Sequence, residues 1–74
     1  MVDIVLNCKG LSCPLPIVQI GRTLKKMQVG QTIEVEADDP AFKEDVLAYV
    51  RHLDHTILYI EEGDIIKVTI RKDR

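Results

Sequence analysis

The sequence has few cysteines, almost no aromatic side chains and no excess of positive charge. Its 74 residues include two cysteines, one Phe, two Tyr and no Trp, and the net charge is −2. A secreted domain of this size usually carries several disulfides, so we expect free thiols and a cytoplasmic location. A strong phosphate partner would require a basic excess, so direct nucleic-acid binding is not expected.

Long hydrophobic runs are also absent. None approaches the roughly 20 residues of a membrane span, and the start, Met1-Val2-Asp3, lacks the basic and apolar regions of a signal peptide. A structural zinc site needs about four ligands, whereas His52 and His55 are the only imidazoles. We therefore expect no membrane contact, no metal and no cofactor.

The length of the chain indicates one small domain, residues 1–74, which we expect to be a monomer. Its hydrophobic residues, 46% of the total, are needed for a single core. Little remains for a walled substrate pocket, so chemistry is expected on the outer surface.

Hydrophobic periodicity predicts the secondary structure. Alternation of apolar residues indicates strands, and spacings of three and four indicate helices. The expected strands are 4–8, 32–38, 55–61 and 65–71, and the expected helices are 14–28 and 40–53. The order β-α-β-α-β-β, with one polar sheet face, predicts an α/β two-layer sandwich: a four-stranded mixed sheet with both helices on one face and a right-handed first crossover.

The glycines and the acidic pair before the second helix predict turns, close contacts and helix ends. Gly30 is expected to end the first helix, Gly21 to pack closely against the sheet, and Gly63 to adopt a positive φ in a hairpin turn. Asp38 and Asp39 are interpreted as helix-capping residues rather than as an acid pair. Asp39 is expected at the N-cap, with Pro40 at the first helical position.

The segment from Lys9 to Pro16 links the first strand to the first helix and contains the most informative motif. Because Cys13 precedes a proline, it is expected in the extended geometry of an N-cap, with Pro14 and Pro16 at the first and third helical positions. The N–H of Leu15 is then the only candidate donor to Cys13 Sγ. That hydrogen bond, the helix dipole and the nearby Lys9 predict a lowered pKa and a substantial thiolate fraction.

Such a thiol suits sulfur exchange better than hydrolysis. An acyl-transfer cysteine needs an oriented histidine base, and His52 and His55 show no sign of pairing with Cys13. An exposed, moderately acidic thiol can attack a sulfane sulfur, hold it as a persulfide and surrender it to another thiol.

The run Gly10-Leu11-Ser12-Cys13-Pro14-Leu15-Pro16 resembles the signature of the TusA/SirA family of small sulfur carriers, and the resemblance extends through residues 27–30, 37–41, 54–55 and 70–72. The resemblance implies a sulfurtransferase in which Cys13 accepts sulfane sulfur from a cysteine desulfurase or a rhodanese-like donor. A downstream acceptor protein in tRNA thiolation, molybdenum-cofactor work or sulfur oxidation then receives it.

The residues expected to support the active turn around Cys13 are Lys9, Gly10, Leu11, Pro14, Leu15 and Pro16. The chain departs from the family pattern at Asn7 and Lys9, which replace an Asp-x-Arg sequence, and at Val50, where some members have cysteine.

Two alternative functions stay open. One is a non-catalytic interaction or regulatory module, and the other is a dithiol redox protein that uses Cys8 with Cys13. Cys8 continues the apolar face of Ile4 and Leu6, which favours a core position over a resolving thiol.

Overall fold

The computed structural model describes residues 2–74 and contains the six expected elements. They are β1 (Ile4–Asn7), α1 (Leu15–Lys26), β2 (Thr32–Ala37), α2 (Phe42–His52), β3 (Thr56–Glu61) and β4 (Ile66–Arg71). The predicted order β-α-β-α-β-β is confirmed. The element bounds differ from the prediction by only a few residues, as is usual at fraying helix and strand ends.

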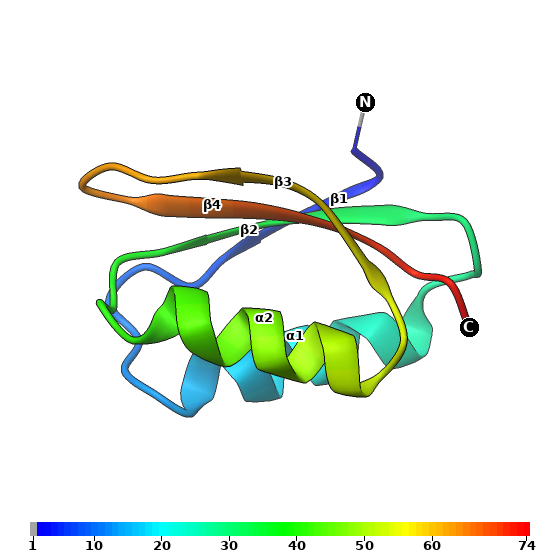
Figure 1. Cartoon of the computed structure of the whole chain (residues 1–74), viewed down its shortest axis with the longest axis horizontal. Coiled ribbons are helices and arrows are strands. Elements are labelled where there is room, and N and C mark those ends of the chain that lie inside the picture. The colour runs from blue at the N-terminus through cyan, green and yellow to red at the C-terminus, as the bar shows by residue number, and fades with distance from the viewer. Residues whose placement is uncertain (1) are drawn as a thin grey trace.

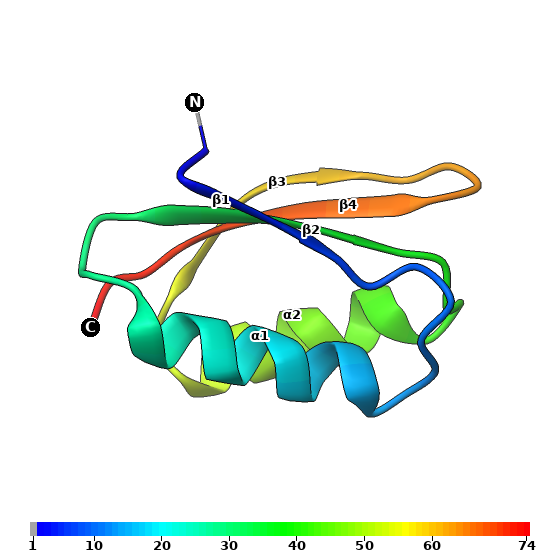
Figure 2. The ribbon, with the colours of Figure 1, turned by 180° about the vertical axis from the view of Figure 1, so that it is seen from behind.

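The four strands form one mixed sheet in the order β1-β2-β4-β3. β1 runs parallel to β2, whereas β4 is antiparallel to both β2 and β3. Figure 1 shows both helices against the same face of this sheet, and the reverse view in Figure 2 agrees. The predicted two-layer sandwich is therefore confirmed.

The core lies between the helices and the covered face of the sheet. In β2 the side chains alternate, so that Ile33, Val35 and Ala37 are fully buried while the residues between them are partly exposed. The predicted stripes of both helices meet this face. Their buried members are Ile20, Leu24, Met27, Phe42, Val46 and Val50. The period of two in the strands and the helical period in α1 and α2 thus place the apolar side chains of the sheet and of the helices in the same core.

Two glycines differ from the prediction. α1 ends at Lys26, and Met27 at its C-cap is already extended. Gly30 instead occupies a turn in which Gln31 N–H donates to the Gln28 carbonyl, and its φ of 93° explains why glycine stands there. Gly63 does not adopt the predicted positive φ, because the β3–β4 connection is a wider loop of residues 62–65.

Gly21 packs against a helix and not against the sheet, so that prediction was wrong. A Cβ placed on Gly21 would lie 2.4 Å from Tyr49 Oη of α2. The missing side chain therefore allows α1 and α2 to approach closely. Both helices begin at the same end of the molecule (Figure 2), and the close contact lies beyond their first turns, at Gly21 of α1 and Tyr49 of α2.

The parallel pairing of β1 and β2 determines which loops are neighbours. The carboxyl ends of parallel strands meet at one edge of a sheet, so the segments that follow them emerge side by side. Here these are residues 8–14, before α1, and residues 38–41, before α2 (Figures 1 and 2). The cysteine motif and the acidic pair, far apart in the sequence, thus come together.

Candidate active site at the start of the first helix

The loop after β1 begins with a tight turn. Leu11 N–H donates to the Cys8 carbonyl at 3.2 Å, and Gly10 has a φ of 83°, which only glycine adopts at no steric cost. Lys9 N–H donates to Asn7 Oδ1 at 3.0 Å. Asn7 therefore supplies a side-chain oxygen that accepts a backbone N–H at the start of this loop.

Two consecutive carboxylates fasten this loop from across the sheet edge. The Asp38 carboxylate accepts the N–H of Gly10 at 3.1 and 3.2 Å, and Asp39 Oδ2 accepts the N–H of Cys13 at 2.8 Å. Each bond pairs a charged acceptor with a backbone donor, the stronger kind of hydrogen bond. The loop that carries Cys13 is thus tied to the loop that precedes α2.

These contacts correct the predicted capping roles. The regular helix α2 begins at Phe42, with Ala41 at its N-cap and no side-chain cap. Asp39 Oδ1 accepts Ala41 N–H at 3.0 Å and closes the turn before the helix, while its other oxygen serves Cys13. These two backbone N–H groups, Ala41 first and Cys13 second, lower the pKa of Asp39.

The start of α1 is shifted by one residue from the prediction. Pro14, not Cys13, occupies the N-cap, so Leu15 and Pro16 become the first and second helical residues. The N–H of Leu15 donates to the Ser12 carbonyl at 2.9 Å, not to Cys13 Sγ. Pro16 is buried, Leu15 is exposed, and the Cys13–Pro14 peptide bond is cis.

The thiol of Cys13 is exposed and faces a carboxylate. Its S–H donates to Oδ2 of Asp45, in the first turn of α2, with a separation of 3.1 Å between Sγ and the oxygen. This hydrogen bond to the neutral thiol is the largest cause of a raised Cys13 pKa, followed by desolvation and by the charges of Asp45 and Asp39. The predicted lowering of this pKa is therefore wrong.

Lys9 does not offset these acidic neighbours. It is exposed, and among residues 2–74 no ion pair involves its ammonium group. Lys9 is therefore close to Cys13 in the sequence but forms no ion pair with the carboxylates described near the thiol. The carboxylates supplied by α2 and by the other loop instead contribute to the raised pKa of the thiol.

Cys8 belongs to the core, as the strand pattern predicted. Its side chain is 0% exposed, its N–H donates to the Glu36 carbonyl at 2.7 Å, and burial raises the pKa of its thiol. Of the two cysteines in the chain, only Cys13 is presented to solvent. This arrangement disfavours a redox pair in which Cys8 reacts readily.

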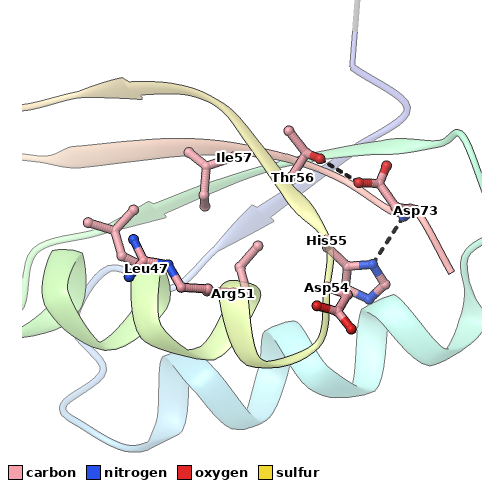
Figure 3. Close-up of a pocket in the computed structure, with 8 residues that line it drawn as sticks. Leu47, Arg51, Asp54, His55, Thr56, Ile57 and Asp73 are labelled. Carbon is pink, nitrogen blue, oxygen red and sulfur yellow. Dashed lines mark hydrogen bonds between the residues drawn. The ribbon is translucent and has the colours of Figure 1, made fainter.

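A hollow of about 480 Å³ lies at the opposite end of α2 (Figure 3). It is lined by Leu47, Val50, Arg51, Asp54, His55, Thr56, Ile57 and Asp73. Three of its polar residues are hydrogen-bonded to one another: His55 Nδ1 accepts the N–H of Asp73 at 3.0 Å, and the Thr56 hydroxyl donates to the Asp73 carboxylate. None of the predicted site residues lines it, so the exposed thiol of Cys13 and this hollow are separate features.

Metal binding and membrane insertion find no support in the described chain. Residues 2–74 place no three His, Cys, Asp or Glu side chains where they could share a metal ion. The helices formed by these residues are too short or too polar to cross a bilayer.

Sequence reasoning missed three residues of the site: Asp38, Asp39 in its contact with Cys13, and Asp45. The first two could have been found from the predicted β-α-β crossover, because parallel strands place their following loops together. Asp45 carried no such signal. Its position beside Sγ depends on how closely α2 packs against α1.

The chain is similar to a known protein family and to a described relative. The chain matches the family described as Sulfurtransferase TusA over residues 4–72. It is 41% identical over 71 residues to YrkI of Bacillus subtilis, described as a candidate sulfur carrier protein, with 95% of each chain covered.

Two longer proteins contain a similar region. A candidate sulfur carrier of Aquifex aeolicus is 37% identical over 62 residues, 84% of this chain and 32% of that protein. YrkF of Bacillus subtilis, also described as a candidate sulfur carrier, is 37% identical over 70 residues, 93% of this chain and 38% of that protein.

The fold is similar to that of a solved structure. The crystal structure of a SirA-like protein from Desulfitobacterium hafniense superposes with a TM-score of 0.83 and covers 96% of this chain and 99% of that one. The sequence identity is 19%, so this likeness supports the fold alone.

Proposed function

Because this chain belongs to the TusA sulfurtransferase family, we propose that it carries sulfane sulfur as a persulfide on Cys13. In this proposal a donor protein loads Cys13 and an acceptor protein unloads it. The family match supports sulfur transfer in general, and the geometry around Cys13 supports this particular residue.

The observation that carries the proposal is the presentation of Cys13. The thiol is exposed at a helix start, while Asp38 and Asp39 fix the backbone on its N-terminal side through Gly10 and Cys13 itself. Sulfur transfer between two proteins requires that the sulfur reach into a partner's active site. A solvent-exposed thiol on a fastened loop meets that requirement, whereas the buried Cys8 does not.

The chemistry needs no further catalytic group from this chain. The Cys13 thiolate attacks the terminal sulfur of a donor persulfide, a new S–S bond forms, and the donor cysteine leaves as a thiolate. Hydrolysis is not supported, because His52 and His55 lie at the far end of α2 from Asp45 and Cys13. The chain acts as a carrier, and its partners supply the donor and acceptor chemistry.

The donor in this proposal is a cysteine desulfurase or a rhodanese-like protein, since both present sulfane sulfur on a cysteine. The acceptor is a protein of tRNA thiolation, molybdenum-cofactor synthesis or sulfur oxidation. A mixed disulfide trapped at Cys13 and identified by mass spectrometry would distinguish these acceptors.

The direct test is intact-mass measurement after incubation with a cysteine desulfurase and cysteine. We expect an adduct of about 32 Da that reductant removes, the mark of a persulfide. Cys13→Ser should form none, and Cys8→Ala, the matched control, should load as the wild type does. Failure to load from several protein and low-molecular donors would refute the proposal.

One observation favours a second candidate, a non-catalytic interaction module. The acidic neighbours raise the pKa of Cys13 and so disfavour the thiolate in the free protein. If the module is correct, Cys13→Ser leaves partner binding and cellular phenotype intact. If the carrier is correct, that substitution abolishes sulfur transfer while partner binding persists.

A further inference from the structure

Among residues 2–74, Asp45 is the carboxylate that forms a hydrogen bond with the sulfur atom of Cys13 itself. It comes from the first turn of α2, and the Cys13 S–H donates to its Oδ2 at 3.1 Å. Asp39, from the loop before α2, acts on the same thiol through its charge but directs its oxygens to two backbone N–H groups. Lys9, on the loop of Cys13, forms no ion pair within residues 2–74.

The contact stabilises the wrong protonation state for attack. A carboxylate accepts a hydrogen bond from a neutral thiol but repels a thiolate, and the nucleophile in sulfur exchange is the thiolate. Among residues 2–74 the Asp45 carboxylate is half-buried and takes part in no ion pair. Its negative charge is therefore not neutralised within the described chain.

A partner that docks over Cys13 and Asp45 would make the thiolate still less favourable unless the partner supplied positive charge. Displacing water from a thiolate beside a carboxylate lowers the local dielectric constant and strengthens the repulsion between them. A cationic side chain that forms an ion pair with Asp45 would compensate the negative charge of this carboxylate and weaken its effect on the thiol. An apolar or anionic side chain there would keep the thiol protonated.

We propose that Asp45 is a positioning residue that holds the Cys13 thiol protonated in the free protein until a sulfur donor presents a lysine or arginine side chain to this carboxylate. The inference rests on the proposed sulfur-carrier function and specifies the chemistry of the donor surface. When the cation pairs with Asp45, the thiol proton passes to solvent. Cys13 Sγ then bonds to the sulfane sulfur, and the bond from that sulfur to the donor cysteine breaks, leaving its electron pair on the donor thiolate.

The first test measures the rate of Cys13 alkylation by iodoacetamide against pH in the full chain. Asp45→Asn should lower the midpoint of the profile and raise the rate at pH 7. Each tenfold gain in thiolate gives about a threefold gain in rate, because intrinsic nucleophilicity falls with the thiol's basicity. Asp45→Glu, which keeps the charge, should stay near the wild-type profile.

Glu44→Gln is the matched control, because Glu44 also lies in the first turn of α2 but has no bond to Cys13. Its profile should equal that of the wild type. An unchanged or raised midpoint in Asp45→Asn would overturn the proposal. An equal shift in Glu44→Gln would also overturn it, because the effect would then reflect net charge alone.

The second test probes the preference for a cation and does not depend on a variant. Two methanethiosulfonates of similar size, one cationic and one anionic, are compared on the wild type. Each rate is divided by the rate of the same reagent with a free thiol. We expect this normalised rate to be at least about threefold higher for the cationic reagent at low salt, and the ratio of normalised rates to approach one near 1 M salt, where the Debye length is about 3 Å. A ratio near one at low salt would refute the inference.

Sulfur loading from inorganic polysulfide separates the two proposals. If Cys13 loads but Asp45→Asn leaves the alkylation profile unchanged, the inference about Asp45 fails and the carrier function stands. If the profile shifts as expected but no donor loads Cys13, the carrier function fails although Asp45 still controls the thiol.

Discussion

The close approach of the two helices at Gly21 gives a quantitative prediction. A Cβ at position 21 would lie 2.4 Å from Tyr49 Oη but 3.4 Å from the ring carbon that bears the hydroxyl. The first distance is far inside van der Waals contact, whereas the second is tolerable. Removing the hydroxyl oxygen should therefore make room for an alanine.

In the single variant the gain in helix propensity and the cost of overpacking oppose each other, whereas in the double variant only the gain in helix propensity is left. Ala is favoured over Gly within a helix by about 1 kcal/mol. Overpacking against Tyr49 costs about 1–3 kcal/mol, so Gly21→Ala alone should destabilise the protein by about 1 kcal/mol. In the Tyr49→Phe background the same substitution should stabilise it by about 1 kcal/mol, giving a coupling near 2 kcal/mol.

Urea unfolding of the wild type, both single variants and the double variant measures this coupling. In thermal unfolding, each 1 kcal/mol should appear as a shift of about 4–8 °C for a domain of this size. A coupling below about 0.5 kcal/mol would refute the reasoning, because it would mean that the Tyr49 side chain moves aside without cost.

Three further predictions concern the thiols, a helix end and pH. Iodoacetamide should modify Cys13 in the native protein and Cys8 only after unfolding in denaturant, since Cys8 is 0% exposed. The number of adducts, measured by intact mass, checks this prediction. Rapid labelling of both cysteines in the native protein would contradict it. Asp54 follows the C-cap of α2 and has a φ of 61°, so Asp54→Gly should raise stability by about 1 kcal/mol in thermal unfolding. A loss of stability would contradict the strain argument. The pKa of Asp39 is lowered in the folded protein, so its ionised form stabilises the fold above the unfolded pKa of about 3.9. This contribution is lost as the pH falls through the folded pKa. When the free energy of unfolding is measured against pH, the stability difference between the wild type and Asp39→Asn should be constant above about pH 5 and shrink below about pH 4.

Much of the fold could be predicted because its signals are local. Alternation in residues 32–37 and 66–71 identified strands with one buried face, and the spacing of Ile20, Leu24 and Met27 identified the inner face of α1. Each pattern depends only on the backbone period of its own element. The sheet order β1-β2-β4-β3 depends on pairings between elements and was not predicted.

In the candidate site, too, the features that depend on nearby residues were predicted and those that depend on tertiary contacts were not. The motif around Cys13 identified the thiol, and the apolar face of β1 continued to Cys8 identified the core cysteine. The direction of the Cys13 pKa was wrong, since local arguments from the helix dipole and Lys9 omitted Asp39 and Asp45, which are 26 and 32 residues away along the chain.

The amino-acid sequence by itself therefore determined the element types, their apolar faces and the identity of the exposed thiol, because each follows from the residues of one short segment. Tertiary structure decided which carboxylates surround that thiol and hence its protonation. Coulombic and hydrogen-bond energies depend on distance in space, and only the parallel pairing of β1 with β2 and the packing of α1 on α2 bring Asp39 and Asp45 to Cys13.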